Sequence, residues 1–121
     1  MIPEDNIRLK RVYDRAEDAD GVRLLADRLW PRGIKKTDLV YDDWIKDLCP
    51  SDELRKAWHQ HVLTYEAFTK RYLQTLQSES EALERLASLA EKEQITLLSA
   101  VKDLNRSHLP VLRQAILQKT K

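Results

Sequence analysis

The apolar run ITLLSA at residues 95–100 limits the fold of this 121-residue chain more than any other feature. A compact run of this kind is typical of a strand that is buried on both of its faces. Strands covered on both sides occur mainly in parallel sheets, where connecting segments pack against the sheet. The run therefore predicts an α/β fold.

Two further segments have strand patterns. The segment IRLKRVYD at residues 7–14 alternates apolar and charged residues and predicts a partly exposed strand. VRLLADRL at residues 22–29 predicts a strand buried on both faces, with Leu24 and Ala26 on one side and Leu25 on the other. Residues 39–49 leave two alternatives open, a short strand or an irregular segment.

Helical spacing of apolar residues fills most of the remaining chain, from about residue 52 to 92 and from 107 to 118. Ser78 and Glu81 fit a capping box, so the middle region is either one bent helix or two. The predicted helix N-caps are Ser51, Thr64 and Ser107. This order of strands and helices predicts a compact single α/β domain over residues 1–121, with a mostly parallel sheet flanked by helices.

Composition narrows the classes of function. Lys and Arg total 21 and Asp and Glu total 20, a net charge of +1, so any attraction for anions must be local. The chain has no apolar run long enough to span a bilayer and no segment like a signal peptide, which favours a cytoplasmic location and no membrane partner. Cys49 is the single cysteine and is expected to be a small buried residue.

Polar residues gather where two of the predicted strands end. In open α/β sheets, ligands bind outside the carboxyl ends of the strands, beside helix N-termini. One cluster follows the strand at 22–29 and the other follows the strand at 95–100. The predicted ligand-binding residues are Asp27, Arg28, Trp30, Arg32, Lys102, Asp103 and His108.

The residue types in these clusters favour an anionic ligand. Unpaired amides in the first turn of a helix attract anions, and Arg28 or Arg32 can add paired hydrogen bonds to a phosphate or carboxylate. Trp30 offers a flat apolar face, and Asp27 can accept a proton or orient an arginine. A structural alternative is equally open for Asp27 and Arg28, because polar groups at a buried turn need hydrogen-bond partners whatever the function.

The three histidines do not predict a metal site. His59 and His61 are two residues apart, and side chains at that spacing do not share one face of a helix. With His108 far away in sequence, we predict no metal centre, and the sequence leaves the question of a cofactor open.

Five motifs follow one another along almost the whole chain: RVYD, DGVRLLADRLWPRGIKK, CPSDELRKAWHQH, YEAFTKRYLQTL and TLLSAVKD. In this order they resemble the YeaO-like family, which is part of a larger grouping known only as a domain of unknown function. The run at residues 27–33, Asp-Arg-Leu-Trp-Pro-Arg-Gly, is the most specific of them. The resemblance implies a compact α/β fold and supplies no activity.

The chain also departs from the patterns of these relatives. The resemblance implies Ala-Pro-Ser at residues 49–51 and often His-Asp at 61–62, where this chain has Cys49 and Val62. In the wider grouping a Cys-His-Arg triplet is implied where this chain has Ser107, His108 and Leu109. A thiolate nucleophile therefore does not carry over to Ser107, because a hydroxyl needs a positioned base to react.

Three functional hypotheses follow. The leading one is a protein that binds an anionic small molecule, with nucleotides among the candidates, at the carboxyl ends of its strands; whether it catalyses a reaction stays open. The alternative is a noncatalytic protein-interaction or regulatory module that uses the Trp-Pro-Arg-Gly loop at residues 30–33. Nucleic-acid binding through Arg28, Arg32, Lys35 and Lys36 is disfavoured by the nearly neutral net charge.

Overall fold

A four-stranded parallel sheet forms the centre of the structure, a computed structural model that describes residues 2–120. Its strands are β1 (Ile7–Arg11), β2 (Val22–Leu25), β3 (Asp43–Trp44) and β4 (Ile95–Ser99). They lie in the order β1-β4-β2-β3, so β4 is central and β1 is an outer strand. The α/β fold and the parallel sheet are confirmed. The sequence left residues 39–49 as either a short strand or an irregular segment. The segment contains both, because the two-residue β3 is followed by a 3-10 turn at Lys46–Leu48.

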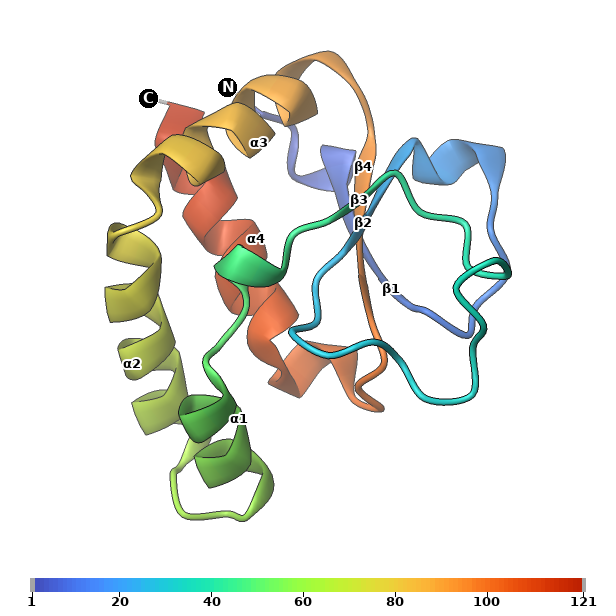
Figure 1. Cartoon of the computed structure of the whole chain (residues 1–121). Coiled ribbons are helices and arrows are strands. Elements are labelled where there is room, and N and C mark those ends of the chain that lie inside the picture. Colours follow the sequence, from blue (N-terminus) through green and yellow to red (C-terminus); the bar gives the residue numbers. More distant parts are fainter. Residues whose placement is uncertain (1, 121) are drawn as a thin grey trace.

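The helices are α1 (Asp52–His59), α2 (Tyr65–Gln77), α3 (Ser80–Lys92) and α4 (His108–Leu117). Figure 1 shows all four on the same side of the sheet. Their apolar side chains pack with Ile7, Leu24 and Leu97 of the sheet into the main core. The helices therefore cover one face of the sheet only. Further 3-10 turns lie at Glu4–Asn6, Asp18–Asp20, Leu104–Arg106 and Gln118–Thr120.

The opposite face of the sheet is covered by the loops that follow β1 and β2 (Figure 1). Val12 and Leu39 from these loops pack on Leu25 and Leu98 in a second, smaller apolar cluster. Trp30 lies against this cluster. Side chains alternate along a strand, so adjacent Leu97 and Leu98 enter different cores, and β4 is buried on both faces as predicted.

The N-termini of the helices lie where the sequence predicts them, with one exception. Ser51, Thr64 and Ser107 accept hydrogen bonds from backbone amides in the first turns of α1, α2 and α4, which confirms these three N-caps. The capping box expected at Ser78 and Glu81 does not form. The Ser78 hydroxyl donates to the Thr75 carbonyl at 2.8 Å instead, and α3 begins one residue later than that box requires. The middle region is therefore two helices.

A buried charge cluster, defined by Asp20, Lys10 and Arg23, lies on the loop-covered face. Asp20 has 0% exposure, and its carboxylate accepts hydrogen bonds from Lys10 Nζ at 3.0 Å and from Arg23. Arg8 adds a contact at 3.2 Å. The sequence predicted a partly exposed first strand. Lys10 departs from that expectation because Asp20 and the Arg15 carbonyl satisfy its ammonium inside the protein.

No helix among residues 2–120 combines the length and the apolarity that crossing a bilayer requires.

Candidate functional site

The carboxylate of Asp27 joins the ends of β2 and β4. Its Oδ1 accepts a hydrogen bond from Ser99 Oγ at 2.6 Å, and its Oδ2 accepts one from the Ala100 amide at 2.8 Å. His108, at the start of α4, lies with Nε2 3.6 Å from Oδ1 of Asp27. The expected meeting of Asp27 and His108 at one sheet edge is therefore confirmed, and Asp27 is largely engaged in holding that edge together.

The imidazole of His108 is buried and neutral. Its Nε2–H donates to the Ala26 carbonyl, and its ring meets the edge of the Tyr72 ring at a centroid distance of 6.2 Å. Burial lowers the pKa of His108, and this effect outweighs the contacts with Ala26 and Asp27, which favour the protonated form. His108 thus supports the loop ends as an uncharged hydrogen-bond donor.

This burial predicts a pH dependence of stability. Because the folded-state pKa of His108 is depressed, the unfolded chain binds a proton more readily, and the free energy of unfolding should fall as pH drops below about 6.5. One proton limits this slope to about 1.4 kcal/mol per pH unit. Urea denaturation between pH 7.5 and 5 should give a smaller slope for His108→Gln than for the unmodified protein. His61→Asn, at an exposed position whose φ of 60° asparagine tolerates, is the control; equal slopes in all three proteins would contradict the assignment.

Arg28 points to the segment before α1. Its Nε donates to the Pro50 carbonyl at 3.0 Å and its Nη2 donates to the Cys49 carbonyl at 2.7 Å. The planar guanidinium thereby fixes residues 49–50, 21 to 22 positions away in sequence, against the end of β2. This arrangement corresponds to the structural alternative for Arg28, and the two bonded nitrogens are already engaged within the protein.

Trp30 organises the loop after β2. Its indole Nε1 donates to the Ile34 carbonyl at 2.6 Å and closes the turn that contains Pro31 and Gly33. The ring contacts Tyr41 and Trp44 edge-on, each at a centroid distance of 5.6 Å. Trp30 is half-buried, so only part of its face is available to a ligand or a partner.

Arg32, Lys102 and Asp103 are the predicted site residues that are exposed. Arg32 and Lys102 make no side-chain ion pair or hydrogen bond within residues 2–120, so their charges face solvent. The Asp103 carboxylate accepts from the Asn105 amide at 3.1 Å and begins the 3-10 turn before α4.

Two residues at the same edge escaped the sequence prediction. The Tyr13 hydroxyl donates to the Arg32 carbonyl at 3.0 Å, and the Tyr13 ring is 49% exposed. The guanidinium carbon of Arg11 lies 4.9 Å from the centre of that ring, while Arg11 Nε donates to the Val101 carbonyl at 2.9 Å. Tyr13 and Arg11 thus connect the Arg32 loop to the segment that carries Lys102. The signal available in the sequence was their position at the carboxyl end of β1.

The candidate nucleophiles are held in structural roles. Ser107 Oγ donates to the Leu104 carbonyl at 2.8 Å and accepts from the Leu109 amide at 3.1 Å, as an N-cap does. Cys49 is buried as predicted, and burial raises the pKa of its thiol far above the ordinary value, so the thiol stays protonated. Among residues 2–120, neither side chain contacts the activating base that nucleophilic catalysis requires.

Metal-binding side chains do not converge in the part of the chain that the structure covers. No group of three or more His, Cys, Asp or Glu residues between residues 2 and 120 is arranged to hold an ion. His59 and His61 are exposed, and His61 lies in the turn after α1 with a φ of 60°.

The fold and its edge define a class of small α/β domains in which one sheet face carries the helices and the other carries loops. Residues 6–121 match the family described as "Inactive DUF488-N3 subclade", and the chain belongs to that family. It is 51% identical over 107 residues to uncharacterized protein YeaO of Escherichia coli strain K12, covering 88% of this chain and 93% of that protein.

Mycobacterial proteins are also similar. Uncharacterized protein Rv3073c of Mycobacterium tuberculosis strain H37Rv is 38% identical over 116 residues, which cover 96% of this chain and 98% of the relative. Uncharacterized protein Mb3100c of Mycobacterium bovis matches at the same identity and coverage. No solved structure gives a significant match.

Proposed function

We propose that this protein binds an anionic small molecule, without transforming it, at the carboxyl edge of its sheet. The contact residues in this proposal are Arg32, Lys102, Arg11 and Tyr13, which we call the cationic edge. Asp27, Arg28, Trp30 and His108 hold the surrounding loops in place, and Asp103 shapes the turn next to Lys102. The proposal keeps the cytoplasmic location expected from the sequence.

The hydrogen bond from the Tyr13 hydroxyl to the Arg32 carbonyl carries this proposal. It fixes the backbone of the Arg32 turn beside a half-exposed aromatic ring that already contacts the Arg11 guanidinium. Guanidinium groups bind phosphate or carboxylate with paired hydrogen bonds, and an exposed ring supports a flat group on the same ligand. The net charge of the whole chain is only +1, so the feature that favours an anion here is local: the side chains of Arg32 and Lys102 make no ion pair or hydrogen bond among residues 2–120.

Binding without catalysis is favoured by the chemistry around the cationic edge. Ser107 is used as a helix cap, Cys49 is buried and protonated, and His108 donates a hydrogen bond to the Ala26 carbonyl. General acid–base or nucleophilic catalysis needs such groups within reach of a ligand. The description of the family as an inactive subclade is consistent with this proposal.

A thermal-shift screen of phosphorylated metabolites and nucleotides tests whether an anion binds. A compound that binds only the folded protein raises its melting temperature by mass action, by an amount that depends on concentration relative to Kd. We expect a phosphorylated compound to give a shift that weakens as salt rises, because exposed charges are screened. If no compound shifts the melting temperature at low ionic strength, the proposal fails.

Arg32→Lys separates recognition from stability. The change keeps the positive charge and removes the planar fork, so affinity for the strongest compound of the screen should fall by roughly tenfold. The melting temperature should change little because the Arg32 side chain makes no internal bond among the described residues. Calorimetric titration and thermal denaturation of the same samples measure both quantities.

The matched control is Arg28→Lys, which alters a guanidinium that bonds to the Cys49 and Pro50 carbonyls. This variant should lose stability, by about 1 to 3 kcal/mol, because the buried carbonyls lose their donors. An Arg32→Lys protein that is less stable but binds as before would overturn the role of Arg32 in anion recognition.

A further inference from the structure

The outer edge of β1 has backbone groups that face away from the sheet. The Val12 amide donates to the Ser99 carbonyl at 2.9 Å, toward β4. Backbone direction alternates along a strand, so the N–H and C=O groups of Leu9 and Arg11 point to the opposite, outer edge. The Arg11 amide fits this alternation, because it donates to Asp14 Oδ2 at 3.0 Å rather than to β4. At Leu9 the outer edge is therefore open for pairing.

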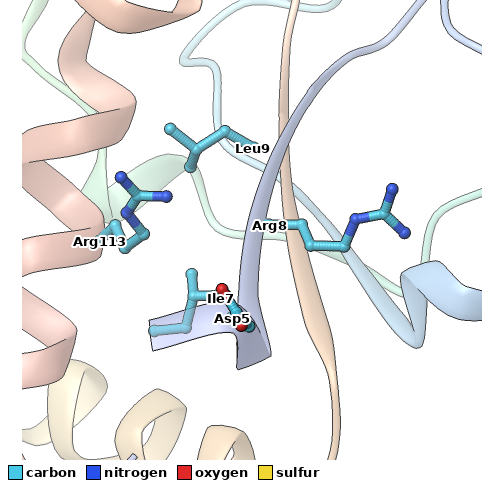
Figure 2. Close-up of a pocket in the computed structure, with 5 residues that line it drawn as sticks. All are labelled: Asp5, Ile7, Arg8, Leu9 and Arg113. Carbon is cyan, nitrogen blue, oxygen red and sulfur yellow. The ribbon is translucent and has the colours of Figure 1, made fainter. Parts of the chain in front are cut away.

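A shallow depression of about 500 Å³ runs along this edge. Figure 2 shows Leu9 and Arg113 on the helix side of β1, with Arg8 projecting to the other side. Ile7 and Asp5 complete its lining near the start of the strand. The depression thus combines an apolar floor with a guanidinium on each side of the strand.

The guanidiniums of Arg8 and Arg113 differ in whether a carboxylate lies beside them. Arg8 lies 3.2 Å from the carboxylate of Asp20 and 3.6 Å from that of Glu17. Arg113, on α4, makes no ion pair or side-chain hydrogen bond to any residue from 2 to 120, and it is half-buried. A partly desolvated cation without a counter-charge gains more from a carboxylate than a fully exposed one does. The helix side of the depression therefore favours an acidic group.

We propose that the β1 edge accepts an extended acidic segment of a partner protein as a fifth strand of the sheet. Main-chain hydrogen bonds to Leu9 would anchor the segment, and a carboxylate on alternate residues would meet Arg113. A second copy of this chain is a poorer occupant. Three of the five residues of β1 are cationic, so pairing β1 with itself would place like charges opposite one another.

The test uses a blocked eight-residue peptide in which Val and Glu alternate, added to the full-length protein labelled with ¹⁵N. We expect binding with a Kd below about 1 mM and the largest amide shifts at Leu9 and around Arg113, as for a strand added to an edge. Two control peptides replace Glu with Lys or methylate alternate backbone nitrogens. Equal binding of either control peptide would overturn the proposal.

Arg113→Gln should weaken binding of the Val/Glu peptide by roughly tenfold, since it removes a charged hydrogen-bond partner from the edge. Arg85→Gln, at an exposed position on α3, is the matched control and should bind as the unmodified protein does. Unchanged affinity in Arg113→Gln would refute the acidic specificity. Concentration-dependent dimerisation with shifts at Leu9 would assign the edge to a second copy instead. These residues lie outside the cationic edge, so the result is independent of the anion-binding proposal.

Discussion

Asp20→Asn is expected to lower the free energy of unfolding by about 3 to 5 kcal/mol, the usual cost of removing one partner from a buried ion pair. The Asp20 carboxylate is fully buried and is the counter-charge for Lys10 and Arg23, which are themselves buried. Asparagine keeps the size of the side chain but leaves Arg23 without an anionic partner, and it leaves Lys10 with only the exposed carboxylate of Glu17, 3.1 Å away. The cost therefore comes from uncompensated charge rather than from lost packing.

Urea denaturation at pH 7 measures this effect, with Asp18→Asn in the same 3-10 turn as the control because Asp18 is exposed.

The ion pairs of Asp20 also make the free energy of unfolding depend on pH in the acidic range. Desolvation raises the pKa of Asp20, but hydrogen bonds from the Glu17 amide, Lys10 and Arg23, with the charge of Lys10, hold it below 3.8 overall. Its stabilisation is therefore complete above about pH 4 and is lost as pH falls through the lowered pKa. Asp20→Asn should lack this loss; a cost below about 1 kcal/mol at pH 7 would mean that the cations find other partners.

Leu98→Ala should destabilise the protein by about 2 to 5 kcal/mol. Leu98 has 0% exposure, and its side chain fills the space between the sheet and the loops after β1 and β2. Alanine would remove most of the contacts with Val12 and Leu25 and leave a cavity. The spread of the estimate reflects how far the loops can close over the vacated space.

Chemical denaturation with Leu29→Ala as the control tests this prediction, because Leu29 is 55% exposed and should lose well under 1 kcal/mol. A small effect at Leu98 would mean that the loop-covered face contributes little to folding. The Leu98 result therefore measures whether the loops act as a true second layer.

The elements predicted correctly from the sequence are those with a strong local signal. The apolar run of β4, the alternation of Leu24 and Leu25, and the Ser51, Thr64 and Ser107 caps each depend on neighbouring residues, and each is confirmed. The Ser78 capping box failed because the hydroxyl bonds to the preceding turn instead. The two-residue β3 is too short to leave a periodic pattern.

The candidate site was harder to predict because its details depend on contacts between distant segments. The sequence placed Asp27 and His108 at one edge through the topology of parallel strands, and the 3.6 Å contact confirms it. Nothing local indicated that Arg28 would bond to carbonyls at residues 49–50, or that Tyr13 would fix the turn at Arg32. Asp20 lies in a segment without a periodic apolar pattern, and its burial follows from cations on β1 and β2 that share one sheet face.

An NMR titration with inorganic pyrophosphate at low ionic strength is the most direct test of the cationic edge. We expect saturable amide shifts concentrated at Tyr13, Arg32 and Lys102, and we expect Arg32→Gln combined with Lys102→Gln to abolish them while the rest of the spectrum stays unchanged. Shifts that are absent, that spread over the lysines and arginines of the whole surface, or that persist in the double variant would contradict an anion site at this edge.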